Sequence, residues 1–139
     1  MMGLLDGKVA IVTGAGAAGG LAGGLAALGA RLVPGFDLVA DMTGLAGRLR
    51  TADLVVTGEG HLDPPSFEGK VPGGVLALTA GRSPVLCIVG DADEVLRRSP
   101  PAGLEIISLA DRYGAARSRR ETAALVATVT EEVLGRPCP

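Results

Sequence analysis

An apolar run at residues 54–56 leads directly into a polar loop at residues 57–72, which contains carboxylate, ammonium and hydroxyl groups between glycines. Pro72 ends this loop, and proline favours the first turn of a helix. A buried strand, a glycine-bearing loop and a new helix, in this order, are typical of open α/β sheets, which hold ligands at the carboxyl ends of their strands. We therefore expect the chemistry of the chain to lie in this loop.

Strand-like and helix-like patterns alternate along the chain. Short apolar runs typical of buried strands lie at residues 8–13, 31–33, 53–57, 84–89 and 104–109. The stretches between them favour helices, and the last one, from residue 118, is amphipathic. Alternation of this kind favours a parallel sheet covered by helices. We predict an α/β fold in a single domain, residues 1–139, with a mostly parallel, Rossmann-like sheet of four to five strands and helices on both faces.

The composition limits the classes of partner. With 139 residues and a hydrophobic content of 47%, the chain is long enough to bury one core. No apolar stretch reaches the roughly 20 residues that span a bilayer, and the start lacks the cationic region of a signal peptide, so we expect a cytoplasmic protein without membrane contact. A net charge of −2 and an aromatic content of 2% argue against nucleic-acid binding. Cys87 and Cys138 suggest neither a disulfide nor a metal site.

Several blocks of sequence follow one another in a fixed order between about residue 14 and residue 134. They lie at residues 14–21, 28–30, 34–35, 52–60, 62–63, 66, 69–70, 72 and 74–75. Together these blocks resemble the carboxyl-terminal part of the bacterial glycerate kinase family. The resemblance implies a transferase that moves a phosphoryl group from ATP to glycerate, with ATP and Mg²⁺ as cofactors.

The loop at residues 57–72 contains the groups that this reaction needs. Phosphoryl transfer requires charge neutralisation of the phosphates, a metal ion that bridges their oxygens, and a group that orients or deprotonates the attacking hydroxyl. Lys70 could supply the positive charge, while Glu59 and Asp63 could hold Mg²⁺ or accept the substrate proton. The sequence does not decide between the carboxylates. An ordinary loop is the alternative, in which Asp63 organises a turn, Glu59 caps backbone amides and Lys70 is a surface charge.

Further residues are candidates for contacts with substrate or phosphate through backbone amides or hydroxyls. They are Gly14, Gly16, Gly19, Gly20, Thr57, Gly58, Gly60, Ser66 and Gly69. The glycines at residues 14–20 could present amides to an anion, although close helix packing explains them equally well. Ser66 is as readily an N-cap or turn residue. We expect His61 at the rim of the site, and Asp91 and Asp93 to cap the helix that follows them.

Residues 2–16 resemble instead the opening of a short-chain dehydrogenase/reductase, with a leading strand and a glycine turn. This second resemblance implies NAD(P) as an alternative cofactor. The chain departs from the dehydrogenase pattern at Ala18, where that family has its middle glycine. It also has Arg117 four residues after Tyr113, where the dehydrogenases have a catalytic lysine that arginine cannot replace. We interpret residues 1–16 as a dehydrogenase-like start joined to a kinase-like segment at a shared Gly-Ala-Gly.

Glycerate kinases of this type are much longer than this chain, and their amino-terminal segments have no counterpart before Gly14. We therefore expect a kinase domain that is catalytically incomplete as an isolated chain. The alternatives are a truncated NAD(P)-binding dehydrogenase domain and a non-catalytic assembly domain. Apolar surface left uncovered in such a fragment would favour association into a homo-oligomer.

Overall fold

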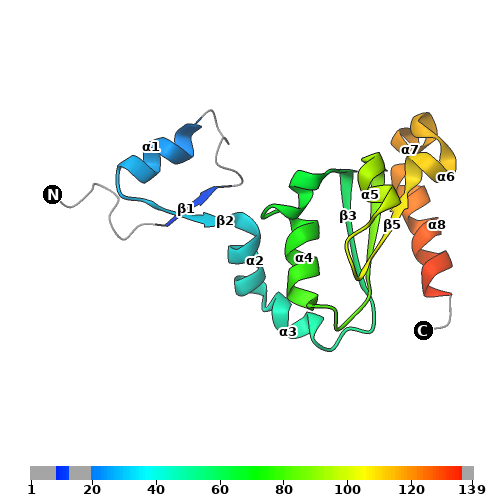
Figure 1. Ribbon diagram of the computed structural model, residues 1–139, viewed down its shortest axis with the longest axis horizontal. Coiled ribbons are helices and arrows are strands. Elements are labelled where there is room, and N and C mark those ends of the chain that lie inside the picture. Colours follow the sequence, from blue (N-terminus) through cyan, green and yellow to red (C-terminus); the bar gives the residue numbers. More distant parts are fainter. Residues whose placement is uncertain (1–8, 13–19, 136–139) are drawn as a thin grey trace. The chain divides into compact units, whose positions relative to one another are not determined.

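Two compact units make up the chain, residues 1–45 and residues 46–139, and the computed structural model describes residues 9–12 and 20–135 within them. The first unit contains β1 (Val9–Val12), α1 (Leu21–Ala27), β2 (Arg31–Pro34) and α2 (Gly35–Thr43) (Figure 1). Its two strands are parallel, with Val9 opposite Arg31, and α1 contacts both of them. The first unit is therefore a small strand–helix–strand crossover followed by a helix.

The second unit contains a three-stranded sheet whose strands are all parallel, in the order β3-β4-β5. After α3 (Leu45–Leu49), its elements are β3 (Val55–Leu62), the 3₁₀ helix η2 (Pro64–Phe67), α4 (Val71–Thr79), β4 (Val85–Ala92), α5 (Glu94–Arg98), β5 (Leu104–Ser108), α6 (Leu109–Tyr113), α7 (Ala115–Arg120) and α8 (Thr122–Leu134). Because the strands are parallel, β3, β4 and β5 all have their carboxyl ends at the same edge of the sheet.

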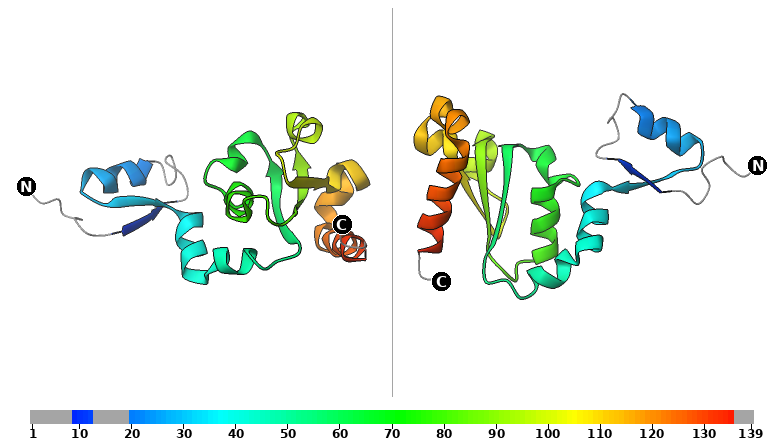
Figure 2. Two further views of the ribbon diagram at one scale, coloured as in Figure 1. Left: turned by 60° about the horizontal axis from the view of Figure 1, so that its bottom comes forward. Right: turned by 180° about the vertical axis from the view of Figure 1, so that it is seen from behind.

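Helices cover both faces of this sheet. Figures 1 and 2 show α4 on one side of the strands and α8 on the other. On the α8 side, Ile88 of β4 packs with Leu125 and Val129 in a buried cluster. Successive residues of a strand point to opposite faces, so Cys87 lies on the α4 side. Its side chain is fully buried there. The second unit therefore has a buried layer on each face of its sheet, and β4 contributes residues to both layers.

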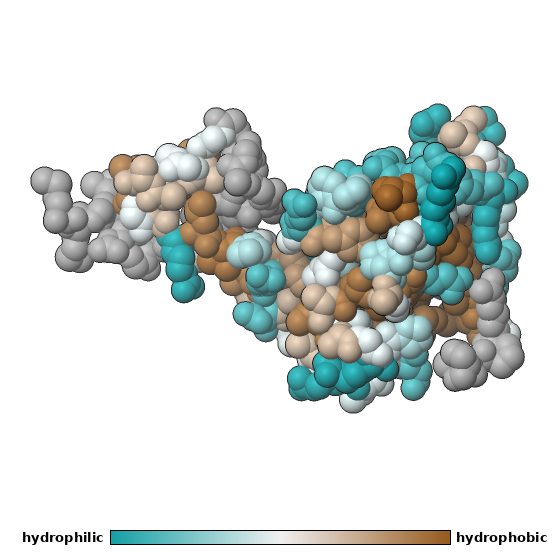
Figure 3. All heavy atoms as spheres, viewed as in Figure 1, coloured by the Kyte–Doolittle hydropathy of each residue, from teal (hydrophilic) through white to brown (hydrophobic). Residues whose placement is uncertain are grey.

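The surface of the second unit is mixed in character. Figure 3 shows hydrophilic residues over much of the viewed face, with hydrophobic residues between them. Within residues 9–12 and 20–135, no helix is long and apolar enough to cross a membrane. The exposed large hydrophobic side chains of the second unit are Val56, Val71, Val95, Val126 and Leu134.

The structure confirms a parallel α/β arrangement with helices on both faces for the second unit, and it corrects the number of strands per sheet. The strands predicted to form one sheet of four to five divide between a two-stranded and a three-stranded sheet. Apolar periodicity identifies a strand from its own residues, whereas pairing depends on distant parts of the chain. The sequence pattern therefore located the strands without revealing which of them are neighbours.

The end of β3 is a second correction. We predicted a strand that stops at residue 57, but β3 continues to Leu62 and pairs with β4 as far as Leu62 opposite Ala92. Gly58 and Gly60 look like strand breakers in the sequence. In the structure Gly58 lies so close to β4 that an added Cβ would stand 2.6 Å from the carbonyl oxygen of Ile88. The first six residues of the predicted polar loop, 57–62, are therefore part of a strand, which gives their side chains fixed directions.

Candidate active site

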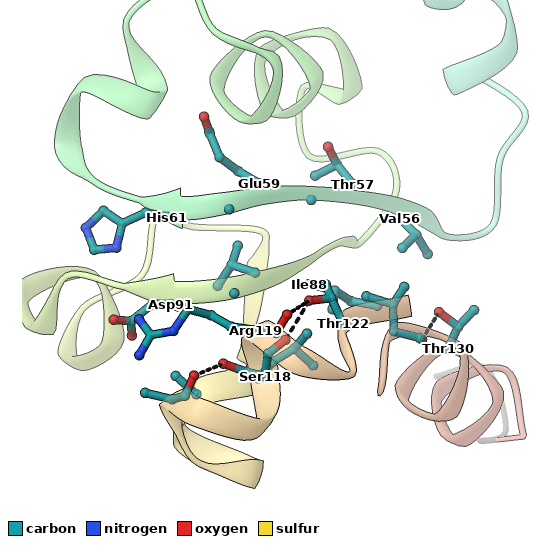
Figure 4. A pocket seen from close by; sticks show the side chains of 18 residues that line it. Val56, Thr57, Glu59, His61, Ile88, Asp91, Ser118, Arg119, Thr122 and Thr130 are labelled. Atoms are coloured by element: carbon teal, nitrogen blue, oxygen red, sulfur yellow. Dashed lines mark hydrogen bonds between the residues drawn. The ribbon is translucent and has the colours of Figure 1, made fainter. Parts of the chain in front are cut away.

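The alternation of β3 distributes its side chains between two faces of the sheet. Thr57 and Glu59 point toward the side that carries α4, whereas Val56 points toward the side of α7 and α8 (Figure 4). His61 follows at the carboxyl end of the strand. The carboxylate of Glu59, one of the two that we predicted as catalytic, is therefore on the α4 face of the sheet.

Glu59 carries a carboxylate oxygen that the fold does not satisfy. Its Oε2 is buried and has no hydrogen-bond partner among the described residues. Glu59 lies opposite Val89 in the strand register, two residues beyond the pair of Thr57 and Cys87. Burial, and after it the charge of Glu59, raises the pKa of the Cys87 thiol to about 11. A buried oxygen without a hydrogen-bond partner costs stability, and such groups are found where a function requires them. We therefore treat Glu59 as a candidate functional residue.

The segment after β3 brings Asp63, Ser66 and Lys70 together. Asp63 is the N-cap residue of η2, and the pair Asp63 and Ser66 forms a capping box. The Ser66 hydroxyl donates to Asp63 Oδ1 at 2.7 Å, and the Asp63 backbone N–H donates to Ser66 Oγ at 3.2 Å. Lys70 Nζ lies 3.6 Å from the same Asp63 Oδ1. Spacing in the sequence predicted a site in this loop, and the structure places these three residues in contact.

These contacts lower the pKa of Asp63 below its ordinary value of 3.8. The largest cause is the hydrogen bond from the Ser66 side chain, and the charge of Lys70 adds to it. A carboxyl whose pKa is lowered in the folded state contributes stability that is present above the unfolded pKa and is lost as the pH falls through the folded pKa. Asp63 is therefore ionised at neutral pH and stabilises the fold in that form.

We expect Asp63→Asn to make the chain less stable at pH 7, and this difference to shrink as the pH falls. The wild-type carboxyl loses its charge as the pH falls through its folded pKa, so the two proteins become alike there. Thermal unfolding followed by circular dichroism between pH 2 and pH 7 measures this. Asp53→Asn is the control, since Asp53 is exposed and has no ion pair in the described part of the chain. Parallel stability curves for wild type and Asp63→Asn across this range would contradict the expectation.

Further charged residues gather at the carboxyl ends of β4 and β5. His61 Nε2 lies 3.0 Å from Asp93 Oδ1, although the two residues are 32 apart in the sequence. Arg97 of α5 contacts both Asp91 and Asp111, at 3.2 Å to the latter. We predicted that Asp91 and Asp93 cap α5. Asp93 occupies the N-cap position, but its side chain makes no capping hydrogen bond. It contacts His61 instead.

The sequence pattern did not connect His61 with Asp93, or Arg97 with Asp91 and Asp111. The strand register, which places His61 opposite Asp91, is what brings these residues together. A signal was present in the polar residues that follow the strand pattern at 84–89, at the edge where ligands bind in such sheets. Without the strand order, this signal could not be connected to His61.

A groove of about 740 Å³ runs along β3 on the side of α7 and α8 (Figure 4). Its wall offers few free donors, because the Thr122 hydroxyl donates to the Ser118 carbonyl and the Thr130 hydroxyl to the Val126 carbonyl. The charged groups that phosphoryl transfer needs are mainly on the opposite face and at the rim. Residues that line the groove include Val56, Gly58, Ile88, Arg119, Thr122 and Val126.

The candidate glycines have different environments. Gly60 has open space where a Cβ would be, and Gly69 has a φ of +76°, which favours glycine. Gly20 is the N-cap residue of α1 in the first unit, with a φ of +92°. The predicted contacts of Gly14, Gly16 and Gly19 lie outside the described residues.

A metal site made by the chain alone is not found in residues 9–12 and 20–135, where no three His, Cys, Asp or Glu residues are grouped to hold an ion. Mg²⁺ is commonly bound by one or two carboxylates together with substrate phosphates and water. The unpartnered oxygen of Glu59 and the ionised carboxylate of Asp63 suit this mode of binding. They would hold Mg²⁺ only together with a phosphate ligand.

The glycerate kinase family model matches residues 3–136. The chain belongs to the glycerate kinase family. A glycerate kinase from Halalkalibacterium halodurans is 46% identical over 85 residues, which are 60% of this chain and 22% of that protein. A glycerate kinase from Neisseria meningitidis serogroup B is 43% identical over 88 residues, 63% of this chain and 24% of that protein. The matched region is therefore less than a quarter of the length of these two glycerate kinases.

A crystal structure of a candidate glycerate kinase 2 from Salmonella typhimurium LT2 aligns with 87% of this chain and 34% of its own, at 33% identity and a TM-score of 0.47. The family match also bears on the first residues of the chain. It begins at residue 3 and so includes most of the segment that resembles a dehydrogenase. The comparisons give no support to a dehydrogenase-like start, and the glycerate kinase family accounts for this segment as well.

Proposed function

We propose that this chain forms part of an ATP-dependent glycerate kinase and that Glu59, Asp63 and Lys70 act on the reacting groups. Membership of the glycerate kinase family supports a kinase that acts on glycerate. The observation that carries the assignment of residues is the placement of an unpartnered carboxylate oxygen on β3, followed by an ionised aspartate paired with a lysine. These are the charges that phosphoryl transfer uses.

The two carboxylates have different proposed roles, because their surroundings differ. The contacts of Asp63 with Ser66 and Lys70 lower its pKa, which makes it a weak proton acceptor. Glu59 Oε2 has no hydrogen-bond partner among the described residues, which leaves it available to a substrate hydroxyl. In the proposed step, Glu59 takes the proton of the attacking hydroxyl as the new oxygen–phosphorus bond forms and the bond to the leaving diphosphate breaks.

Lys70 would contact a phosphate of ATP at the start of α4. Its side chain is 46% exposed and stands at the N-cap position of that helix. Glu59 and Asp63 would hold Mg²⁺ together with the phosphates, and the ion would supply neutralisation of their charge. Thr57, Gly58, Gly60, Ser66 and Gly69 complete the proposed site, through direct contacts or by shaping its backbone. Because the chain spans less than a quarter of the two glycerate kinases compared, we propose that its turnover alone is far below theirs.

The test is a comparison of Lys70→Met with Arg82→Met, using ATP and Mg²⁺ with and without glycerate. We expect Lys70→Met to weaken ATP binding by about 10- to 100-fold, the loss typical of a hydrogen bond to a charged group. Arg82 lies beyond the other end of α4 and donates to a backbone carbonyl, so its substitution removes an equal charge away from the site. Titration calorimetry and transfer of radiolabelled phosphate to glycerate provide the two measurements. Equal affinities for the two variants would contradict the role of Lys70.

A further inference from the structure

Ser66 is the most enclosed polar residue of the candidate site, with 0% of its surface exposed. Its hydroxyl has two partners, and both belong to Asp63. It donates to the Asp63 carboxylate and accepts from the Asp63 backbone N–H. Because its one proton is already donated to Asp63, this hydroxyl cannot also donate to a bound phosphate in this conformation. The sequence suggested a direct phosphate contact for Ser66. The structure favours a different role, the orientation of Asp63.

The segment around Ser66 is fixed by close packing. Gly73, in the first turn of α4, lies so near to η2 that an added Cβ would stand 2.6 Å from the Cα atom of Phe67. Proline follows the N-cap residue of η2, and Gly69 adopts a left-handed conformation before α4. The backbone from Asp63 to Lys70 is therefore held at both ends and in the middle, which restricts where the two charged side chains can lie.

One carboxylate oxygen connects the buried and exposed parts of this arrangement. Asp63 Oδ1 accepts the Ser66 hydroxyl at 2.7 Å and lies 3.6 Å from Lys70 Nζ. We propose that Ser66 is a positioning residue of the kinase site: it fixes the rotamer of Asp63, and Asp63 in turn holds the Lys70 ammonium where it meets a phosphate. The contact of Lys70 with a phosphate rests on the proposed function, whereas the orientation of Asp63 by Ser66 does not.

The ordinary explanation is that Ser66 serves only the local fold of η2. A helix cap of that kind affects stability, with no particular effect on a neighbouring charge. The positioning role predicts more. Removal of the hydroxyl would take away the hydrogen bond at 2.7 Å that holds the Asp63 carboxylate, and would leave the Lys70 side chain without a fixed partner.

The experiment compares three variants of the whole chain, Ser66→Ala, Ser66→Thr and Ser83→Ala. Ser83 is the matched control, because it is also buried and its hydroxyl donates to the Ala52 carbonyl at 2.6 Å, with no carboxylate involved. Three-bond NMR couplings of the Asp63 side chain, measured at neutral pH, report its rotamer in each protein, which requires no activity. ATP affinity and phosphate transfer to glycerate are then measured on the same samples.

We expect the Asp63 side chain to average over several rotamers in Ser66→Ala, with ATP affinity reduced by about tenfold. Ser83→Ala should keep the wild-type rotamer of Asp63, and Ser66→Thr, which keeps a hydroxyl, should lie closer to the wild type than Ser66→Ala does. An unchanged Asp63 rotamer in Ser66→Ala would overturn the proposal. A changed rotamer in a chain that neither binds ATP nor transfers phosphate would support the orientation of Asp63 and contradict the proposed function instead.

Discussion

Glu59→Gln should lower phosphate transfer to glycerate by a factor of about 10² to 10⁴, the usual contribution of a positioned general base. Glutamine has nearly the same shape but cannot accept the proton of the attacking hydroxyl. The substitution should not destabilise the chain, because it removes a carboxylate that has a buried oxygen without a hydrogen-bond partner. Single-turnover transfer from radiolabelled ATP, with protein in excess, measures the rate even when turnover is slow.

Glu68→Gln is the control for this experiment. Glu68 lies on the same segment, is exposed, and has no ion pair in the described part of the chain. We expect its rate to stay within a factor of about two of the wild type. A further signature does not depend on activity: the pKa of the Cys87 thiol should fall in Glu59→Gln, since the charge of Glu59 contributes to raising it. A fall in rate of the same size in both variants would contradict the role of Glu59.

Gly73→Ala should destabilise the chain by about 1–3 kcal/mol, the range typical of overpacking in a well-packed site. A methyl group at this position would lie 2.6 Å from Phe67 Cα and 2.7 Å from the Phe67 carbonyl oxygen. These are backbone atoms, which cannot move aside as the end of a flexible side chain can. The helix propensity of alanine offsets only about 1 kcal/mol of this cost. Urea denaturation followed by circular dichroism measures the change in the free energy of unfolding.

Gly47→Ala makes the same chemical change in a helix without the clash. An added Cβ at Gly47 would find only the side chain of Arg50, at an ordinary 3.7 Å. We expect this control to be neutral or stabilising. Gly73→Ala should also weaken ATP binding, because a shift between η2 and α4 would separate Asp63, the N-cap residue of η2, from Lys70, the N-cap residue of α4. If the two glycine variants had equal stabilities, the close approach of α4 to η2 would be wrong.

The sequence was sufficient to predict that Asp63, Ser66 and Lys70 lie in one segment, and to predict much of the layer structure. The apolar run before the polar loop identified β3, and the spacing of Asp63, Ser66 and Lys70 indicated a connected group. Contacts between residues three to seven positions apart depend mainly on local turn chemistry, which the residues themselves encode. The capping box of Asp63 and Ser66 belongs to this class.

Other features depend on pairing between distant segments. The contact of His61 with Asp93 requires β3 and β4 to be neighbours in a particular register. The side of the sheet that Glu59 faces depends on β3 continuing beyond Gly58, whereas we predicted that the strand ends at residue 57. The division of the strands between two sheets is also a property of long-range packing. None of these features leaves a signal in local periodicity.

The continuation of β3 to Leu62 limits how this part of the family can vary in length. An insertion or deletion of one residue before Glu59 would exchange the two faces of the strand beyond it. The carboxylate would then project toward α7 and α8, and a glycine would take its place beside α4. Length changes of this kind would separate Glu59 from Lys70 without altering either residue. Variation in length is therefore easier to accommodate in the turn between α4 and β4, at the other end of the sheet.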